Sequence, residues 1–358
     1  MNRLQTYMED RALDAMLITS PKHVYYLTGY SSDPHERLLA LILTRGDEPK
    51  LLVPALDLEA AQAVSSVPGI HTHGDTDNPY EILGRLLPVS MGTLGVEKDD
   101  LNVNRYEAIL SAVAARTVVD IGGPLRDMRA VKSREEAACM RKAVRIVEDV
   151  LRSVVSQVKA GAAEIELVAE LEYRMKKLGA QGPSFGTTVL TGPKTAMPHG
   201  NPDGRKVAEG ELVLFDLGVY ADGYASDMTR TFAVGEVSEE LRRIYGVVLE
   251  GNLRAIEAIR PGVTLASLDR AARNSITAAG YGPYFNHRLG HGLGMDIHEY
   301  PSVHGMNEDP VIEGMVFTVE PGIYVPGVGG VRIEDDVMVT RDGVEVLTTY
   351  PKELTVIG

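Results

Sequence analysis

The sequence contains little cysteine, a deficit of basic residues and no long apolar run. Cys139 is the single cysteine among 358 residues, so an internal disulfide is excluded and a reducing, cytoplasmic location is expected. Acidic residues outnumber basic ones by 50 to 36, and the resulting charge of -14 argues against a nucleic-acid partner because it repels phosphate backbones. No segment approaches the roughly 20 apolar residues that cross a bilayer, and the first residues lack the apolar core of a signal peptide. We therefore expect no membrane association.

The composition itself is typical of a globular protein with a sizeable core. Apolar residues make up 44% and charged residues 24%, and at roughly 100–200 residues per domain the length suggests two domains. In residues 1–128, short apolar runs alternate with helical patterns, which indicates an α/β domain. The expected strands are 15–19, 38–44, 50–53, 93–96 and 117–120, and the expected helices are 56–65, 80–87 and 104–114.

A long helix opens the second part, residues 129–358. Ser133 and Glu136 have the spacing of a capping box, and apolar residues then recur at steps of four and three, which marks one buried stripe. Gly161 is the expected stop of this helix. We place the domain boundary just before it, near residues 128–132.

The second part also repeats itself weakly, with an offset close to 100. Residues 158–161 (VKAG) are echoed by 259–262 (IRPG), and residues 182–185 (GPSF) by 282–285 (GPYF). Five residues separate the pair Glu209-Gly210 from Asp216, and five again separate Glu313-Gly314 from Glu320. Several echoes in the same order predict a duplicated α+β unit with pseudo-twofold symmetry. Related units often build a site at their interface, so Asp216 and Glu320 are expected to meet near the symmetry axis.

Acidic residues end or flank several apolar strands of the second part. Asp216 closes one such run, and Asp227 follows a glycine-containing turn, as on the two arms of a hairpin. Glu320 follows another buried-looking run, and Glu334 lies in the alternating segment 331–336. Taken singly, each acid is more often a surface turn or capping residue. Carboxylates that face one another repel, however, and are costly to bury without a cation.

His291 lies between glycines, which let a backbone approach a ligand closely. A lone histidine is more often a hydrogen-bonded structural residue than a ligand. Together with the four acids it gives an oxygen-rich set that suits a pair of divalent metals better than a structural zinc cage. Two such ions can bridge a water and lower its pKa, which makes a nucleophile at neutral pH. The five candidate ligands are Asp216, Asp227, His291, Glu320 and Glu334.

Segments 216–231, 290–294, 318–322 and 332–335 resemble the motifs of the pita-bread metallopeptidases (family M24), which include prolidase, Xaa-Pro aminopeptidase and methionine aminopeptidase. The resemblance covers the whole second part, and all five ligand positions are filled in order. The first part is similar to the N-terminal domain of the creatinase, prolidase and aminopeptidase P branch. The resemblance implies an α/β domain at 1–128 and an α+β pita-bread catalytic domain at 129–358, with the internal repeat.

The resemblance also implies roles for matching residues. Asp216, Asp227, His291, Glu320 and Glu334 would hold two divalent ions, with Mn²⁺ favoured by the oxygen-rich shell and Co²⁺ or Zn²⁺ as alternatives. Glu320 would also carry a proton from the bridging water to the leaving nitrogen. His199 and His298 would steady the substrate carbonyl and the tetrahedral intermediate. The implied reaction is hydrolysis of Xaa-Pro dipeptides by a metal-bridging hydroxide, as in prolidase.

Two further features resemble prolidases of lactic acid bacteria. Arg288 matches the arginine that binds the substrate carboxylate, a group that a guanidinium holds bidentately. The loop 32–37 (SDPHER) matches one that reaches the partner subunit's active site, so Asp33 and His35 would gate substrate and the enzyme would be a homodimer. Arg332 is expected to support Glu334 or the substrate. Without the resemblance, these are an ordinary surface arginine and a charged turn.

Three other functions remain open at this point. An Xaa-Pro aminopeptidase (aminopeptidase P) would act on longer peptides. A creatinase-like hydrolase uses the fold without metals, but that branch loses the acids that this chain retains. A non-catalytic peptide-binding scaffold of the same fold has no need of a costly acidic cluster.

Overall fold

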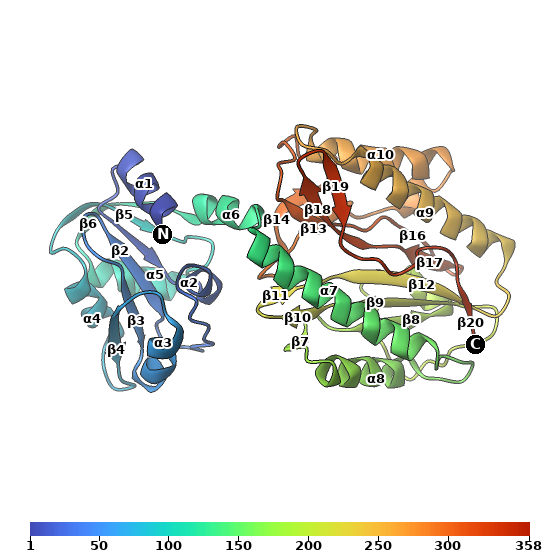
Figure 1. Ribbon diagram of the computed structural model, residues 1–358, viewed down its shortest axis with the longest axis horizontal. Coiled ribbons are helices and arrows are strands. Elements are labelled where there is room, and N and C mark those ends of the chain that lie inside the picture. The colour runs from blue at the N-terminus through green and yellow to red at the C-terminus, as the bar shows by residue number, and fades with distance from the viewer. The chain divides into compact units, whose positions relative to one another are not determined.

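The computed structural model describes residues 1–358, and the chain divides into two compact units, Met1–Met128 and Arg129–Gly358 (Figure 1). Both units mix helices and strands. None of the helices combines the length and the apolar character that a membrane crossing requires.

The first unit is built on a six-stranded sheet of order β4-β3-β2-β1-β5-β6. The strands are β1 Ala15–Ile18, β2 Ala40–Thr44, β3 Lys50–Pro54, β4 Gly69–His73, β5 Met91–Val96 and β6 Ala115–Asp120. The helices are α1 Asn2–Asp10, α2 Pro21–Thr28, α3 Leu58–Val64, α4 Pro79–Leu86, α5 Val103–Ala112 and α6 Gly122–Ala130. Alternate residues of β1 belong to two separate apolar clusters, with Met16 in one and Leu17 in the other. Both faces of the sheet are therefore buried, which explains its continuous apolar strands.

The predicted elements of this unit are confirmed, with shifted ends. The five expected strands match β1, β2, β3, β5 and β6, and the three expected helices match α3, α4 and α5. A 3-10 turn, Ala55–Asp57, takes up the start of the expected helix 56–65. The patterns of α1, α2, β4 and α6 were too short or too polar to be predicted.

The second unit contains two larger sheets, each backed by a pair of helices. The four-stranded sheet has the order β20-β12-β9-β8, and the five-stranded sheet has the order β14-β13-β15-β18-β19. Helices α7 and α8 share an apolar cluster with the four-stranded sheet. Helices α9 and α10 share another with the five-stranded sheet, on the opposite side of the unit (Figure 1). The helices are α7 Arg134–Val155, α8 Glu164–Lys177, α9 Glu239–Ala258 and α10 Leu265–Ala278. The strands of the two sheets are β8 Thr188–Thr191, β9 Leu212–Leu217, β12 Met228–Val234, β13 Gly290–Gly292, β14 Glu299–Val303, β15 Val316–Val319, β18 Asp335–Thr340, β19 Gly343–Val346 and β20 Val356–Ile357.

Shorter elements connect these sheets. They are the strands β7 Gly182–Pro183, β10 Val219–Ala221, β11 Tyr224–Ala225, β16 Gly322–Val325 and β17 Gly329–Arg332, and the 3-10 turns η2 Gly192–Ala196 and η3 Gly282–Tyr284. Strands β10 and β11 join β7 in a separate small sheet. Asp216 and Asp227 were expected on the two arms of a hairpin, and this is confirmed: β9 and β12 pair antiparallel with Leu217 opposite Met228, while β10 and β11 form in the connection between them.

Helix α7 begins as predicted but ends early. The Ser133 hydroxyl accepts the Glu136 N–H at 3.2 Å, and the Glu136 carboxylate accepts the Ser133 N–H at 2.7 Å, which confirms the capping box. The helix ends at Val155, six residues before the predicted stop at Gly161. Val158 is buried although it lies outside the helix, so the apolar pattern continues beyond the helical backbone.

The internal repeat is visible in the backbone. Strands β9 and β12 pair antiparallel, as do β15 and β18. Three pairs of equivalent glycines have positive φ: Gly161 and Gly262 at +95° and +89°, Gly179 and Gly280 at +89° and +91°, and Gly210 and Gly314 at +81° and +85°. The echo at 182 and 282 diverges, because one copy forms β7 and the other forms η3.

Candidate active site

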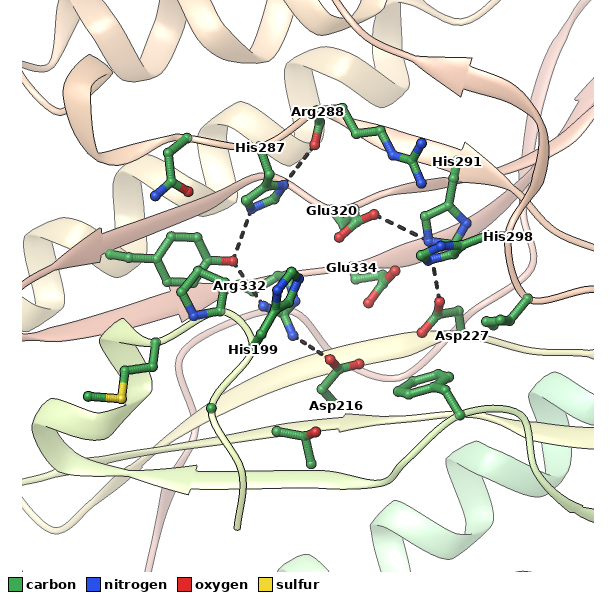
Figure 2. A pocket seen from close by; sticks show the side chains of 18 of the residues that line it. His199, Asp216, Asp227, His287, Arg288, His291, His298, Glu320, Arg332 and Glu334 are labelled. Carbon is green, nitrogen blue, oxygen red and sulfur yellow. Dashed lines mark hydrogen bonds and ion pairs between the residues drawn. The ribbon is translucent and has the colours of Figure 1, made fainter.

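The second unit contains a cavity of about 1100 Å³ lined by residues from both halves of the repeat (Figure 2). Asp216 lies on β9 and Glu320 directly follows β15, while Asp227 directly precedes β12 and Glu334 directly precedes β18. Each half thus supplies one acid at the end of its first strand and one before its second. All five predicted ligands line the cavity, and so do the other predicted residues of this unit, His199, Arg288, His298 and Arg332.

Three of the predicted ligands form a tight buried cluster. Ligand atoms of Asp227, His291 and Glu334 all lie within 4.8 Å of one another. The His291 Nε2 atom is 3.6 Å from Asp227 Oδ2 and 3.4 Å from Glu320 Oε1. Asp227 Oδ1 is buried without a hydrogen-bond partner. A buried carboxylate oxygen with no partner is the kind of group that a cation satisfies.

The surroundings of His291 fix which ring nitrogen faces the acids. Its Nδ1 lies 3.1 Å from the Gly292 carbonyl oxygen, which can only accept, so the ring proton is on Nδ1. Nε2 is left with its lone pair toward Asp227 and Glu320, as a metal-ligating imidazole requires. The His291 N–H also donates to the Thr318 hydroxyl at 3.1 Å, which ties β13 to β15.

The flanking glycines serve strand packing rather than a ligand. A Cβ atom at Gly290 would lie 2.7 Å from the Thr318 carbonyl carbon, and one at Gly292 would lie 2.6 Å from the Pro301 nitrogen. The expectation that these glycines admit a ligand to the backbone is therefore wrong, because neighbouring β15 and β14 occupy that space.

Electrostatics in the cavity oppose a full set of charged acids. Burial raises the pKa values of Asp227 and Glu334 well above their ordinary range, and repulsion from neighbouring carboxylates adds to the shift. Burial also raises the pKa of Glu320 to about 7. Burial lowers the pKa of His291 to about 3, so this ring is neutral at neutral pH. Bound divalent cations would lower the pKa values of these carboxyl groups again. The mostly oxygen donors of the five residues fit such cations.

Arg332 contacts the acid cluster from β17. Its guanidinium forms an ion pair with Asp216 and donates to the Thr229 hydroxyl at 3.0 Å and the Tyr324 hydroxyl at 2.9 Å. Thr229 in turn donates to Glu334 Oε2 at 2.6 Å. Arg332 thus touches Asp216 directly and reaches Glu334 through one hydroxyl.

The predicted substrate-contacting residues differ in exposure. His199 and His298 are exposed at the cavity, and the rings of His298 and His291 have centroids 3.9 Å apart. Burial and the charge of Arg288 lower the pKa of His298. Arg288 is partly buried and donates to the Ser302 hydroxyl at 3.1 Å.

Asp33 and His35 lie in the first unit, outside this cavity lining. Both side chains are exposed, and His35 has a positive φ of 54°. The Asp33 carboxylate accepts the His35 N–H at 3.3 Å. Arg105 donates to the carbonyls of His35, Glu36 and Arg37 at 3.2–3.3 Å, so the loop is held from within its own unit.

Sequence reasoning did not identify several residues of the site. The Tyr324 hydroxyl lies 3.0 Å from His287 Nε2, and burial raises the pKa of Tyr324 to about 12 and lowers that of His287 to about 4. The buried Asp336 accepts the Asp227 N–H at 3.0 Å. The sequence run of three acids at 334–336 could have indicated a role for Asp336. No sequence pattern pointed to Tyr324.

Comparison with known proteins gives matches over both units. The profile of metallopeptidase family M24 matches residues 138–341, and that of the creatinase/prolidase N-terminal domain matches residues 1–131. A Bacillus subtilis protein provisionally named as a dipeptidase is 41% identical, with 100% of both chains covered. The Xaa-Pro dipeptidase from Bacillus anthracis superposes with a TM-score of 0.93 at 34% identity, covering 99% of this chain and 98% of the other. The X-Pro aminopeptidase from Thermotoga maritima gives a TM-score of 0.89 at 31% identity, covering 98% and 100%.

These matches confirm the predicted fold of both units and the resemblance on which the predicted chemistry depended. The M24 profile covers more than half of the chain and includes every residue of the cavity lining described above. The chain belongs to metallopeptidase family M24, the enzymes of which use divalent metal ions, and carries the creatinase/prolidase type of N-terminal domain.

Proposed function

We propose that this protein is a metal-dependent dipeptidase that hydrolyses Xaa-Pro dipeptides, with residues 129–358 as its catalytic domain and 1–128 as its N-terminal domain. The observation that carries the proposal is the buried cluster of Asp227, His291 and Glu334, in which one Asp227 oxygen has no hydrogen-bond partner. The same cavity contains Arg288, a residue suited to bind the carboxylate of a dipeptide. The names of the B. subtilis and B. anthracis relatives support the substrate class.

The proposed ligands of two divalent ions are Asp216, Asp227, His291, Glu320 and Glu334. When bound, the ions supply a water of lowered pKa and polarise the scissile carbonyl. An Xaa-Pro bond is a tertiary amide without an N–H, so it offers no backbone donor at the scissile nitrogen. Polarising the carbonyl avoids the need for that donor. We favour Mn²⁺ because the donors are mostly oxygens, with Co²⁺ or Zn²⁺ as alternatives.

The remaining residues act on the substrate and its protons. Glu320 lines the cavity with Oε1 3.4 Å from His291 Nε2, so it is placed beside the proposed ions to accept a proton from the attacking water and to deliver it to the proline nitrogen. His199 and His298 lie exposed at the cavity, where their rings can donate to the carbonyl oxygen and to the tetrahedral intermediate. Arg288 holds the proline carboxylate, and Arg332 keeps Asp216 in place.

The assembly and location of the enzyme also follow as proposals. We propose a homodimer in which Asp33 and His35 of one subunit gate the substrate of the other. Their exposed side chains, on a loop whose backbone Arg105 holds, support this role. A cytoplasmic enzyme fits the single half-buried cysteine.

A second candidate is an Xaa-Pro aminopeptidase. The similarity to the T. maritima enzyme supports it. So does the cavity volume of about 1100 Å³, which slightly exceeds the roughly 300–1,000 Å³ that is usual for small-molecule sites and leaves room for a longer peptide. The decisive experiment compares Ala-Pro with Ala-Pro-Ala as substrates after metals are stripped with a chelator and restored one at a time. A dipeptidase hydrolyses Ala-Pro far better, an aminopeptidase prefers the tripeptide, and a metal-free hydrolase or a scaffold shows no metal-dependent turnover of either.

A further inference from the structure

The loop that carries His298 is anchored on a buried ion cluster outside the cavity lining. We propose that Lys132, Arg129 and Glu299 act as positioning residues that hold the His298 imidazole in place through the peptide bond it shares with Glu299. The inference rests on the proposed peptide hydrolysis, in which His298 contacts the substrate.

The cluster joins the start of α7 to the start of β14. Lys132 Nζ donates to Glu299 Oε1 at 2.7 Å, and the Arg129 guanidinium donates to the second Glu299 oxygen and to Asp296 Oδ2, the latter at 2.6 Å. The side chains of Lys132, Arg129 and Glu299 are only 1%, 9% and 8% exposed. Two cations thus hold a single carboxylate, and Arg129 also holds the other end of the 296–299 turn.

Such a buried ion cluster is expected to add little to the stability of the fold. Each buried charge loses its hydration, and apolar residues of similar volume would often serve stability as well. The charges instead fix the orientation of the Glu299 carboxylate, because hydrogen bonds from two sides allow it only one position. Packing restricts it further, since a Cβ atom at Gly294 would lie 2.6 Å from Glu299 Oε1 and 3.0 Å from Lys132 Cε.

The anchor for this carboxylate is itself fixed. The Lys132 N–H donates to the Gly314 carbonyl oxygen at 2.8 Å, just before β15, the strand that leads to Glu320. Ser133, the next residue, caps α7. The backbone of Lys132 is therefore tied to the elements that carry the acids, and its side chain is tied to the residue that follows His298.

The consequence for His298 follows from the chain geometry. Its side chain is exposed, and its ring lies against the ring of His291 with centroids 3.9 Å apart. Beyond this contact with the His291 ring, the place of the His298 ring depends on the backbone of 297–299. That backbone is held by Glu299, and a displacement of about 1 Å in a catalytic group can cost about 100-fold in rate.

The test is a double-mutant cycle in the full-length, Mn²⁺-loaded enzyme with Ala-Pro as substrate. We expect Glu299→Gln to lower kcat by about 10- to 100-fold, with a smaller change in KM and no loss of bound metal. In the His298→Ala background the same change should have no further effect on kcat, because the group through which it acts is gone. Losses that multiply would overturn the proposal. The matched control is Glu345→Gln, which removes the same charge from the ion pair with Arg141 and should leave kcat unchanged.

A second measurement does not need turnover. With nine histidines in the chain, ¹⁵N-histidine NMR of the metal-free protein can follow the His298 ring, which should shift in Glu299→Gln and not in Glu345→Gln. An unchanged His298 signal would overturn the proposal. If Glu299→Gln does not fold, Lys132→Arg retains the charge and should show the same non-additivity with His298→Ala. A wild-type enzyme inactive on Ala-Pro refutes the proposed function, whereas an active one with multiplying losses refutes only the positioning role.

Discussion

Arg332 and Asp216 form an ion pair within the acidic cavity, between side chains that are 6% and 18% exposed. Arg332 comes from β17 and Asp216 from β9, so the pair joins a connecting strand to the four-stranded sheet. Because Glu320 and Glu334 also line this cavity, a guanidinium here offsets part of the repulsion among the acids.

Arg332→Met should therefore destabilise the metal-free protein strongly. The variant leaves Asp216 without its cation, and breaking a buried pair costs about 3–5 kcal/mol of the free energy of unfolding. Urea denaturation in the presence of a chelator measures this loss, and added Mn²⁺ should recover part of it. Arg141→Met, which breaks a pair whose side chains are 36% and 40% exposed, should cost no more than about 1 kcal/mol. Equal losses in the two variants would contradict the argument.

Asp227→Asn should change metal binding and metal-free stability in opposite directions. Burial raises the pKa of the Asp227 carboxyl, which costs the folded state stability at pH 7, and asparagine has no such group to ionise. The free energy of unfolding of the metal-free protein should therefore rise by on the order of 1–3 kcal/mol at pH 7. Metal analysis after dialysis should find the ions lost, and Mn²⁺-dependent turnover should disappear with them. Asp222→Asn, at an exposed pair with Lys142, should alter neither property. Retention of both metal and activity in Asp227→Asn would disprove the assigned role.

Local patterns were sufficient to predict most of the fold. The capping box at Ser133 and Glu136 depends on neighbours in the chain, and it appears as predicted. The repeat was detectable because both copies need the same left-handed turns, and glycine is the residue that takes them without strain. The end of α7 was not predictable, because Val158 remains apolar for packing after the helix has stopped.

The features that local patterns missed are contacts between distant residues. Tyr324 pairs with His287, 37 positions away, and Asp336 accepts the N–H of Asp227, 109 positions away. Neither pairing leaves a trace in local periodicity. The acids were identified only as a set, since each alone is more often a surface residue, whereas carboxylates that face one another are costly to bury without a cation.

Arg288→Ala should weaken the binding of dipeptides selectively. The guanidinium lines the cavity and already donates to Ser302, so it is oriented for a second acceptor. Losing a charge-assisted bond of about 1.5–3 kcal/mol should raise KM for Ala-Pro by about 10- to 100-fold, while KM for Ala-Pro-Ala changes little. Steady-state kinetics with both peptides make the comparison. Arg270→Ala, at an exposed pair with Glu308, is the control; unchanged dipeptide kinetics in Arg288→Ala would argue against a carboxylate clamp.

The metal-free protein should carry a specific pH dependence from Glu320. Burial raises the pKa of this carboxyl from 4.5 to about 7 in the folded state. Between these values the folded state binds more protons than the unfolded state, so the contribution of Glu320 to the free energy of unfolding falls by about 3 kcal/mol as pH rises. His291 acts in the opposite sense, because burial lowers its pKa from 6.5 to about 3 and its contribution grows as pH rises across that range.

Glu320→Gln separates the two contributions, since His291 is present in both proteins. Urea unfolding of chelator-treated protein from pH 4.5 to 8 should show the wild-type free energy falling relative to that of Glu320→Gln up to about pH 7 and levelling above it. With saturating Mn²⁺ the wild type should instead become the more stable of the two, because bound ions need the ionised carboxylate. A wild-type advantage that grows with pH in the absence of metal would show that burial does not raise the pKa of this carboxyl.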